Sequence, residues 1–76
     1  MESTVLVQLG SRIREKRKAL GWTQEELADR AQIDRSYIGG VERGERNVTY
    51  TVLCHICGAL GCDVGEIGAG IPEVVR

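Results

Sequence analysis

Arginine side chains near the middle of the chain carry most of the chemistry that this sequence offers. Arg35 and Arg46 each present a planar fork of N–H donors, which matches the O6 and N7 acceptors of guanine. Ser36, beside Arg35, can reach a base or a phosphate. Six further polar residues could donate to phosphate oxygens, which carry no sequence information: Thr23, Gln24, Tyr37, Arg43, Asn47 and Thr49. These residue types favour binding to a nucleic acid if one surface gathers them.

Several of these residues also have a purely structural interpretation. Tyr37 could be a half-buried core ring, and Arg43 could be a surface cation favoured by the dipole at a helix C-terminus. Gly39 and Gly40 could allow close packing against a neighbouring helix, or could leave a bare backbone that sits deep in a groove. The second role adds Gly39 to the candidate base-reading residues, which are then Arg35, Ser36, Gly39 and Arg46.

Three cysteines and one histidine form a second group with chemical potential. Cys54 and Cys57 have the spacing of half a zinc site, but a structural zinc needs four ligands and the sequence holds no second such pair. On a helix, His55 would point about 100° away from Cys54, which also argues against a catalytic cysteine–histidine pair. We therefore expect small packing thiols, with no metal, no cofactor, no small-molecule substrate and no enzymatic activity.

The elements that must position the arginines lie between residues 23 and 44. Thr23 followed by Glu26 predicts a capping box. Trp22 and Leu27 stand at the two positions of a hydrophobic staple around it. A first short helix should therefore begin directly after Thr23.

A second short helix is predicted over about residues 35–43. Asp34 is its expected N-cap, and Gly44 stands where a left-handed residue would close it. Gln32 occupies the tight turn between the two helices, where glycine is common, so modest strain is expected there. A helix, a tight turn and a second helix with basic residues facing outwards is the arrangement of the DNA-reading helix-turn-helix.

One helix over about residues 5–20 precedes this pair, and two more follow over about residues 49–60 and 63–67. Arg17 falls on the apolar stripe of the first helix, and Glu42 falls on the buried side of the third. Two opposite charges in such places predict one buried ion pair. The pattern as a whole predicts an all-α fold.

Length and charge set limits on the kind of protein. The 76 residues predict a single domain, 1–76, with a small core. The net charge of −1 argues against nucleic-acid binding as a bulk property, but residues 12–18 carry five cations against one anion. That basic run is either a solvated helix face or part of the binding surface. No apolar run approaches the roughly 18 residues of a membrane span, and an odd number of cysteines suits reduced thiols, so we expect a cytoplasmic protein.

The sequence resembles the Cro and phage-repressor (XRE-like) family from about residue 9 to residue 67. The resemblance rests on Arg17, Gly21, the block TQEELA at residues 23–28, Tyr37-Ile38, Glu42-Arg43-Gly44 and Leu60-Gly61. The segment IDRSYIGGVERGERNVT is also similar to the recognition segment of restriction–modification controller proteins. The conserved Arg–Glu pair of the family falls on Arg17 and Glu42.

The resemblance implies a compact five-helix, lambda-repressor-like fold with the helix-turn-helix at helices two and three. It further implies a homodimer that binds a two-fold operator on double-stranded DNA, with the third helix in the major groove and the last two helices at the dimer contact. Candidate contact residues are Val64, Ile67 and Ile71. From the sequence, the apolar residues of this segment, which include Val74 and Val75, either close the core or meet another subunit.

The resemblance to controllers implies action at the protein's own promoter, with activation at low occupancy and repression at high occupancy. The alternative is an antitoxin or adaptor that uses the same fold mainly to bind a protein. Such a protein would be expected to carry an appended segment for its partner, and only about nine residues follow the fifth predicted helix.

Overall fold

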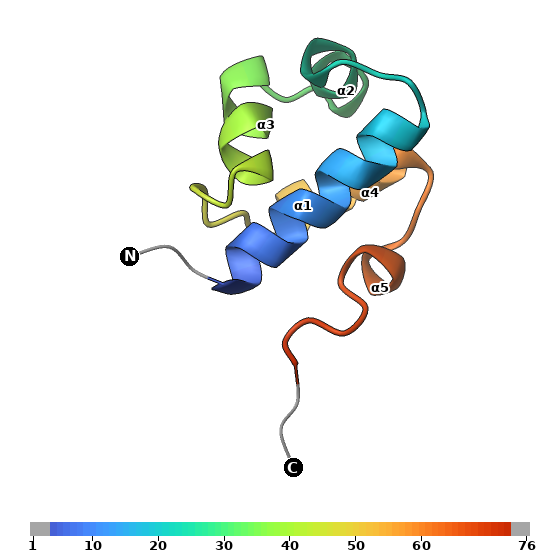
Figure 1. The fold of residues 1–76 in the computed structure, drawn as a ribbon. Helices are drawn as coiled ribbons and strands as arrows, with labels where there is room; N and C mark the ends of the chain where they lie inside the picture. The colour runs from blue at the N-terminus through green and yellow to red at the C-terminus, as the bar shows by residue number, and fades with distance from the viewer. Residues whose placement is uncertain (1–3, 74–76) are drawn as a thin grey trace.

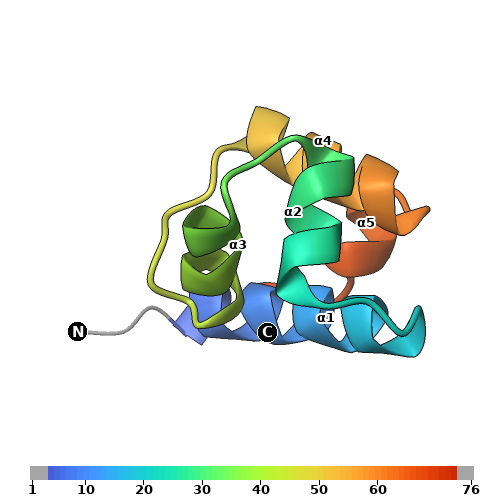
Figure 2. The same ribbon diagram turned by 90° about the horizontal axis from the view of Figure 1, so that it is seen from above.

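The computed structural model describes residues 4–73, which form five helices packed around one apolar core (Figure 1). In chain order the helices are α1 (Thr4–Ala19), α2 (Gln24–Ala31), α3 (Arg35–Glu42), α4 (Tyr50–Leu60) and α5 (Val64–Ile67). Helix α2 packs on α3 and α4, α1 packs on α3, and α5 packs on both α1 and α4 (Figure 2). The predicted all-α fold with a helix-turn-helix at the second and third helices is confirmed.

Side-chain caps fix where the helices begin. Helices α2 to α5 start directly after Thr23, Asp34, Thr49 and Asp63, in that order, and each of these side chains accepts a backbone N–H. The predicted capping box is present: Thr23 Oγ1 accepts from the Glu26 amide, and Glu26 Oε1 accepts from the Thr23 amide, both at 3.1 Å. A second capping box, not predicted from the sequence, joins Asp63 to Glu66 before α5.

Two left-handed residues shape the ends of α2 and α3. Gln32 has φ 56° and is the only non-glycine with positive φ among residues 4–73, as expected for a turn in which glycine is common. Gly44 has φ 76°, and a Cβ built on it would lie 2.8 Å from the Cα of Val7. A side chain at Gly44 would therefore be strained twice, by the backbone angle and by contact with α1.

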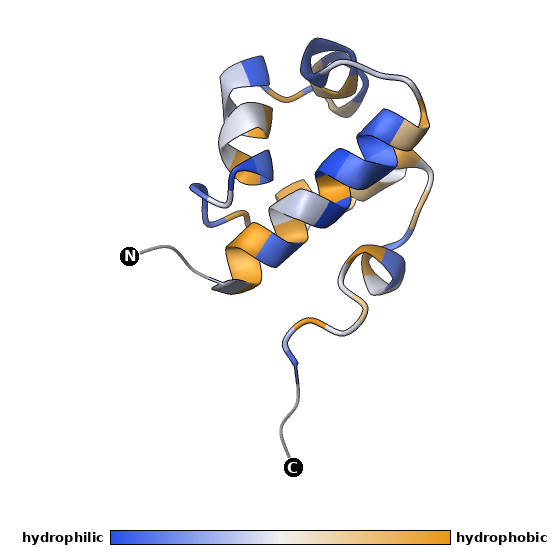
Figure 3. Ribbon diagram, in the orientation of Figure 1, coloured by the Kyte–Doolittle hydropathy of each residue, from blue (hydrophilic) through white to orange (hydrophobic). Residues whose placement is uncertain are grey.

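Every helix contributes a stripe of apolar side chains to the core. In Figure 3, the apolar residues of α3 lie on the side turned toward α1. Its largest fully buried side chains are Ile13, Leu27, Ile38, Val41, Ile56, Cys57 and Ile67. Burial of each large aliphatic side chain stabilises the fold by about 1.5–3 kcal/mol relative to exposure.

The structure corrects the expectation that Ile67 contacts a second subunit. Ile67 is 1% exposed and packs in the core, because α5 turns its apolar side onto α1 and α4. Val64 and Ile71 are half-buried and keep part of their surface accessible. Val74 and Val75 lie outside the described residues.

Gly10 lies where α1 comes close to the backbone of α3, and the only sign of this in the sequence is a small residue within an apolar stripe. A Cβ built on Gly10 would lie 2.3 Å from the carbonyl oxygen of Val41 and 2.6 Å from that of Glu42. The two glycines of α3 have other neighbours, which are side chains of arginine and glutamine. Close packing between α1 and α3 therefore depends on Gly10 rather than on Gly39 or Gly40.

Most cations of the basic run at residues 12–18 are engaged within the fold. Arg12 Nη1 donates to the carbonyl of Ile67 at 3.2 Å, and Lys16 Nζ lies 3.5 Å from Glu66 Oε2, so both tie α1 to α5. Among residues 4–73, no helix has both the length and the apolar character needed to cross a membrane.

Candidate nucleic-acid interface

A buried ion pair holds the helix-turn-helix against α1. Arg17 Nε donates to Glu42 Oε2 at 2.7 Å, and Arg17 Nη2 donates to Glu42 Oε1 at 3.0 Å, so the pair predicted from helical spacing is confirmed. Arg17 Nη1 also donates to the carbonyl of Trp22 at 2.7 Å. The hydrogen bonds that Arg17 donates to Glu42 raise the pKa of Arg17, whereas burial opposes the charged form and lowers it.

Gln24 belongs to the same network, which sequence reasoning missed. Its Nε2 atom donates to Glu42 Oε1 at 3.1 Å, so one acceptor connects α1, the start of α2 and the end of α3. The amide carries two N–H groups, and one of them remains for a ligand after this bond. The network therefore fixes the angle between α2 and α3 and also orients a donor that was predicted to meet phosphate.

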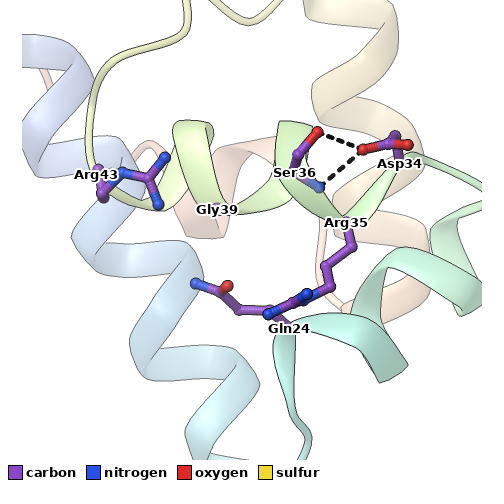
Figure 4. A pocket seen from close by; sticks show the side chains of 6 residues that line it. All are labelled: Gln24, Asp34, Arg35, Ser36, Gly39 and Arg43. Carbon is purple, nitrogen blue, oxygen red and sulfur yellow. Dashed lines mark hydrogen bonds between the residues drawn. The ribbon is translucent and has the colours of Figure 1, made fainter.

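A cavity beside α3 is lined by three of the four predicted base-reading residues. This open cavity of about 410 Å³ is lined by Gln24, Asp34, Arg35, Ser36, Gly39 and Arg43 (Figure 4). Arg35, Gly39 and Arg43 recur every four residues, so they form one ridge along the helix, in which the two arginines are exposed and Gly39 is buried. The ridge and the start of α2 together present guanidinium and amide donors on one surface.

Ser36 is tied to the cap of its own helix. Its backbone N–H donates to Asp34 Oδ1 at 2.8 Å, and its hydroxyl donates to the same oxygen. These bonds from Ser36 lower the pKa of Asp34 below its usual value. Because the hydroxyl hydrogen is directed at Asp34, Ser36 offers a ligand its oxygen lone pairs rather than a donor.

Arg46 turns back along α3 after the helix has ended. A Cβ built on Gly40 would lie 2.8 Å from Arg46 Cγ, so the bare backbone of Gly40 makes room for this side chain. The guanidinium lies 5.5 Å from the centre of the Tyr37 ring, within the range of a cation–π contact. Tyr37 is half-buried and packs against the core, in agreement with the structural interpretation of this ring.

The remaining phosphate candidates stay accessible at the ends of helices. Thr23 and Thr49 accept backbone N–H groups at the starts of α2 and α4, so each hydroxyl still has a hydrogen to donate. Asn47 is exposed in the segment between α3 and α4. These residues flank the ridge of α3 without lining its cavity.

The thiols lie on α4 and in the turn that follows it, and none of them lines this cavity. Cys54 is exposed, Cys57 is buried and Cys62 is half-buried. Burial, reinforced by the neighbouring Cys62 thiol, raises the pKa of Cys57 to about 12, so Cys57 is protonated and a poor metal ligand or nucleophile at neutral pH. Within residues 4–73, no group of three histidine, cysteine or acidic residues has the geometry to hold a metal ion.

The fold and the donor-lined face of α3 define the class of helix-turn-helix transcriptional regulators. Residues 13–67 match the helix-turn-helix family HTH_3, and the chain belongs to that family.

The relatives of this chain include repressors and restriction–modification controllers. It is 39% identical to the control protein C.SmaI of Serratia marcescens over 78% of this chain and 70% of that protein. It is 33% identical to a competence pilus inhibition repressor of Acinetobacter baylyi over 80% of this chain. The chain spans 56% of that repressor and 41% of the immunity repressor of Bacillus phage phi105.

Solved controller structures share the fold. The controller C.AhdI of Aeromonas hydrophila is 47% identical, with a TM-score of 0.80, over 82% of this chain and 94% of that one. The controller C.Esp1396I, as a tetramer in complex with its natural 35-base-pair operator, is 36% identical with a TM-score of 0.81 over 87% of each chain. The similarity to these structures therefore extends over most of the five-helix fold.

Proposed function

We propose that this chain is a sequence-specific transcriptional regulator that binds double-stranded DNA with α3 in the major groove. The two exposed arginines of this ridge, Arg35 and Arg43, lie beside the amide of Gln24, and this is the observation that carries the proposal. The first residues of a recognition helix usually meet base edges. Arg35, the first residue of α3, is therefore the principal candidate for reading a guanine.

Positioning contacts with the DNA backbone complete this arrangement. In the proposed complex, the remaining N–H of Gln24, the hydroxyls of Thr23 and Thr49 and the amide of Asn47 meet phosphates on either side of the groove. The guanidinium of Arg46 lies over the ring of Tyr37, the third residue of α3, and from there it can reach a base or a phosphate.

We further propose a homodimer on a two-fold operator, with the contact on the exposed side of α4 and on α5. The exposed residues of α4 form a face without lysine, arginine, aspartate or glutamate, made of Tyr50, Thr51, Cys54, His55 and Gly58. Tyr50 is 71% exposed, and Val64 and Gly58 line one shared hollow in this region. Ile71 is the third candidate contact residue. The tetramer of the controller C.Esp1396I on its operator supports an oligomeric protein.

The proposed role is that of a restriction–modification controller that acts at its own promoter, in the cytoplasm, without catalytic activity. The controllers C.SmaI, C.AhdI and C.Esp1396I among its relatives support this role. Under it, occupancy of the operator decides between activation and repression.

Titration on DNA tests the proposed function. The protein is titrated on the DNA upstream of its own gene and on a scrambled duplex, each at two salt concentrations. We expect a preference for the upstream DNA of roughly 10³-fold or more, with both affinities falling as salt rises. Equal affinity for the two duplexes would contradict the proposed sequence-specific function.

Two variants distinguish the reading of bases from contacts that only position the protein on phosphates. Arg35→Ala should lose about 1–3 kcal/mol per half-site on the upstream DNA, with little change on the scrambled duplex. Asn47→Ala should weaken both by similar factors, because a phosphate carries no sequence. If Arg35→Ala kept the wild-type ratio of the two affinities, α3 would not read DNA as proposed.

Gly58 offers a test of the dimer. A Cβ built there meets no atom within 4 Å, so Gly58→Glu fits the folded chain but places a charge in the proposed contact. We expect Gly58→Glu to sediment as a folded monomer and Gly58→Ala to remain a dimer at the same micromolar concentration. A wild-type protein that sediments as a monomer under these conditions would exclude this dimer.

A further inference from the structure

Arg43 follows the last residue of α3, but its side chain does not extend beyond the end of the helix. Its guanidinium comes back one turn along the helix: a Cβ built on Gly39 would lie 3.0 Å from Arg43 Nη1 and 3.4 Å from Gln24 Oε1. The missing side chain at Gly39 therefore leaves the space in which this guanidinium lies. In Figure 4, Arg43 and Arg35 approach the cavity from opposite ends of α3, with Gly39 between them.

Glu45 occupies the Nε edge of this guanidinium. Arg43 Nε donates to Glu45 Oε1 at 3.0 Å, and both side chains are more than half exposed, at 58% and 57%. Within residues 4–73 this is the only hydrogen bond made by the Arg43 side chain. The Nη1–Nη2 edge is left as a two-pronged donor, and this is a geometry that the O6 and N7 atoms of guanine accept.

We propose that Arg43 is a second base-reading residue of α3, rather than the phosphate contact that its sequence position predicts. The inference rests on the proposed function above. The Arg43 guanidinium lies beside Gly39, which is four residues, or about 6 Å along the helix axis, from Arg35. At roughly 3.4 Å per base pair, their guanines should be about two base pairs apart in each half-site.

Replacement of Arg43 by lysine distinguishes base reading from a phosphate contact. A lysine keeps the positive charge, so a phosphate contact would largely survive the substitution. It lacks the planar fork, so bidentate reading of guanine would be lost. Arg14→Lys is the matched control, because Arg14 is an exposed arginine on α1 that lines none of the cavity.

Selection from a random duplex library, followed by titration on the best site, tests the inference. The wild-type protein should enrich a two-fold site with two preferred G·C pairs per half-site. Arg43→Lys should lose one of these preferences and keep the other, with an affinity for the best site roughly 10- to 100-fold lower per half-site. Arg35→Ala should lose the complementary preference, and Arg14→Lys should lose neither.

Gly39→Ala provides an independent arm, because its methyl group would shift the Arg43 guanidinium by a few tenths of an ångström without any change of charge. It should weaken the same preference that Arg43→Lys loses, and the double variant should be little worse than Arg43→Lys alone. Thermal unfolding by circular dichroism confirms that each variant is folded. If Arg43→Lys keeps both preferences, or loses both, Arg43 is not a separate reader. If the wild-type protein enriches no sequence, the proposed function itself fails.

Discussion

The ion pair between Arg17 and Glu42 is an arrangement in which removal of one partner costs more than removal of both. The side chains are only 9% and 2% exposed, and Glu42 also accepts from Gln24. Arg17→Ala would leave a buried carboxylate without its main partner, at a cost of about 3–5 kcal/mol.

A double-mutant cycle measures this coupling. Chemical denaturation should show that Arg17→Met combined with Glu42→Leu is far less damaging than the sum of the two single changes. Additive losses from the two single variants would mean that the residues stabilise the fold independently.

Asp34 gives the cap of α3 a dependence on pH. Its bonds from Ser36 lower the pKa of the folded state, so the carboxylate contributes stability above its unfolded pKa of about 3.9. That contribution should be lost as the pH falls through the lower, folded value. Asp34→Asn keeps a capping side chain but does not titrate.

The measurement for Asp34 is the free energy of unfolding as a function of pH. The stability difference between wild type and Asp34→Asn should be constant from about pH 7 to pH 5 and should shrink below about pH 4. A difference that stays constant down to pH 3 would show that this carboxylate is not linked to folding.

At the scale of the helices, one substitution should have opposite effects at two sites. Gly10→Ala would push a methyl group into the backbone carbonyls of α3, and we expect a loss of about 1–3 kcal/mol. Gly58→Ala enters space that is open within one protomer, where alanine should gain about 0.8–1 kcal/mol from helix propensity. Urea titration of both variants checks the signs. A stabilising Gly10→Ala would mean that α1 and α3 can separate at little cost.

At the scale of the whole molecule, a two-fold protein requires a fixed spacing between half-sites. Two α3 helices of a dimer should meet the same face of DNA roughly 34 Å apart, or about ten base pairs. Insertion of about five base pairs between the half-sites should turn one of them to the opposite face. The affinity should then fall to that of a single half-site in a titration. Unchanged affinity on the lengthened DNA would contradict a rigid dimer.

Features that depend on residues close together in the chain could be predicted from the sequence. Thr23 with Glu26, Asp34, Thr49 and Gly44 mark helix ends because caps are local hydrogen bonds and backbone angles. Helical spacing also sufficed for the Arg17–Glu42 pair, because two opposite charges on buried stripes of a small fold need a partner.

The tertiary structure decided what each remaining residue contacts. The sequence could not show that Gly10 lies against the carbonyls of α3, that Ile67 closes the core, or that Gly39 makes room for Arg43. Each of these facts depends on the distance and angle between helices, which packing of the whole core sets. Local patterns fix which side of a helix is buried, whereas only the assembled bundle fixes which neighbour covers it.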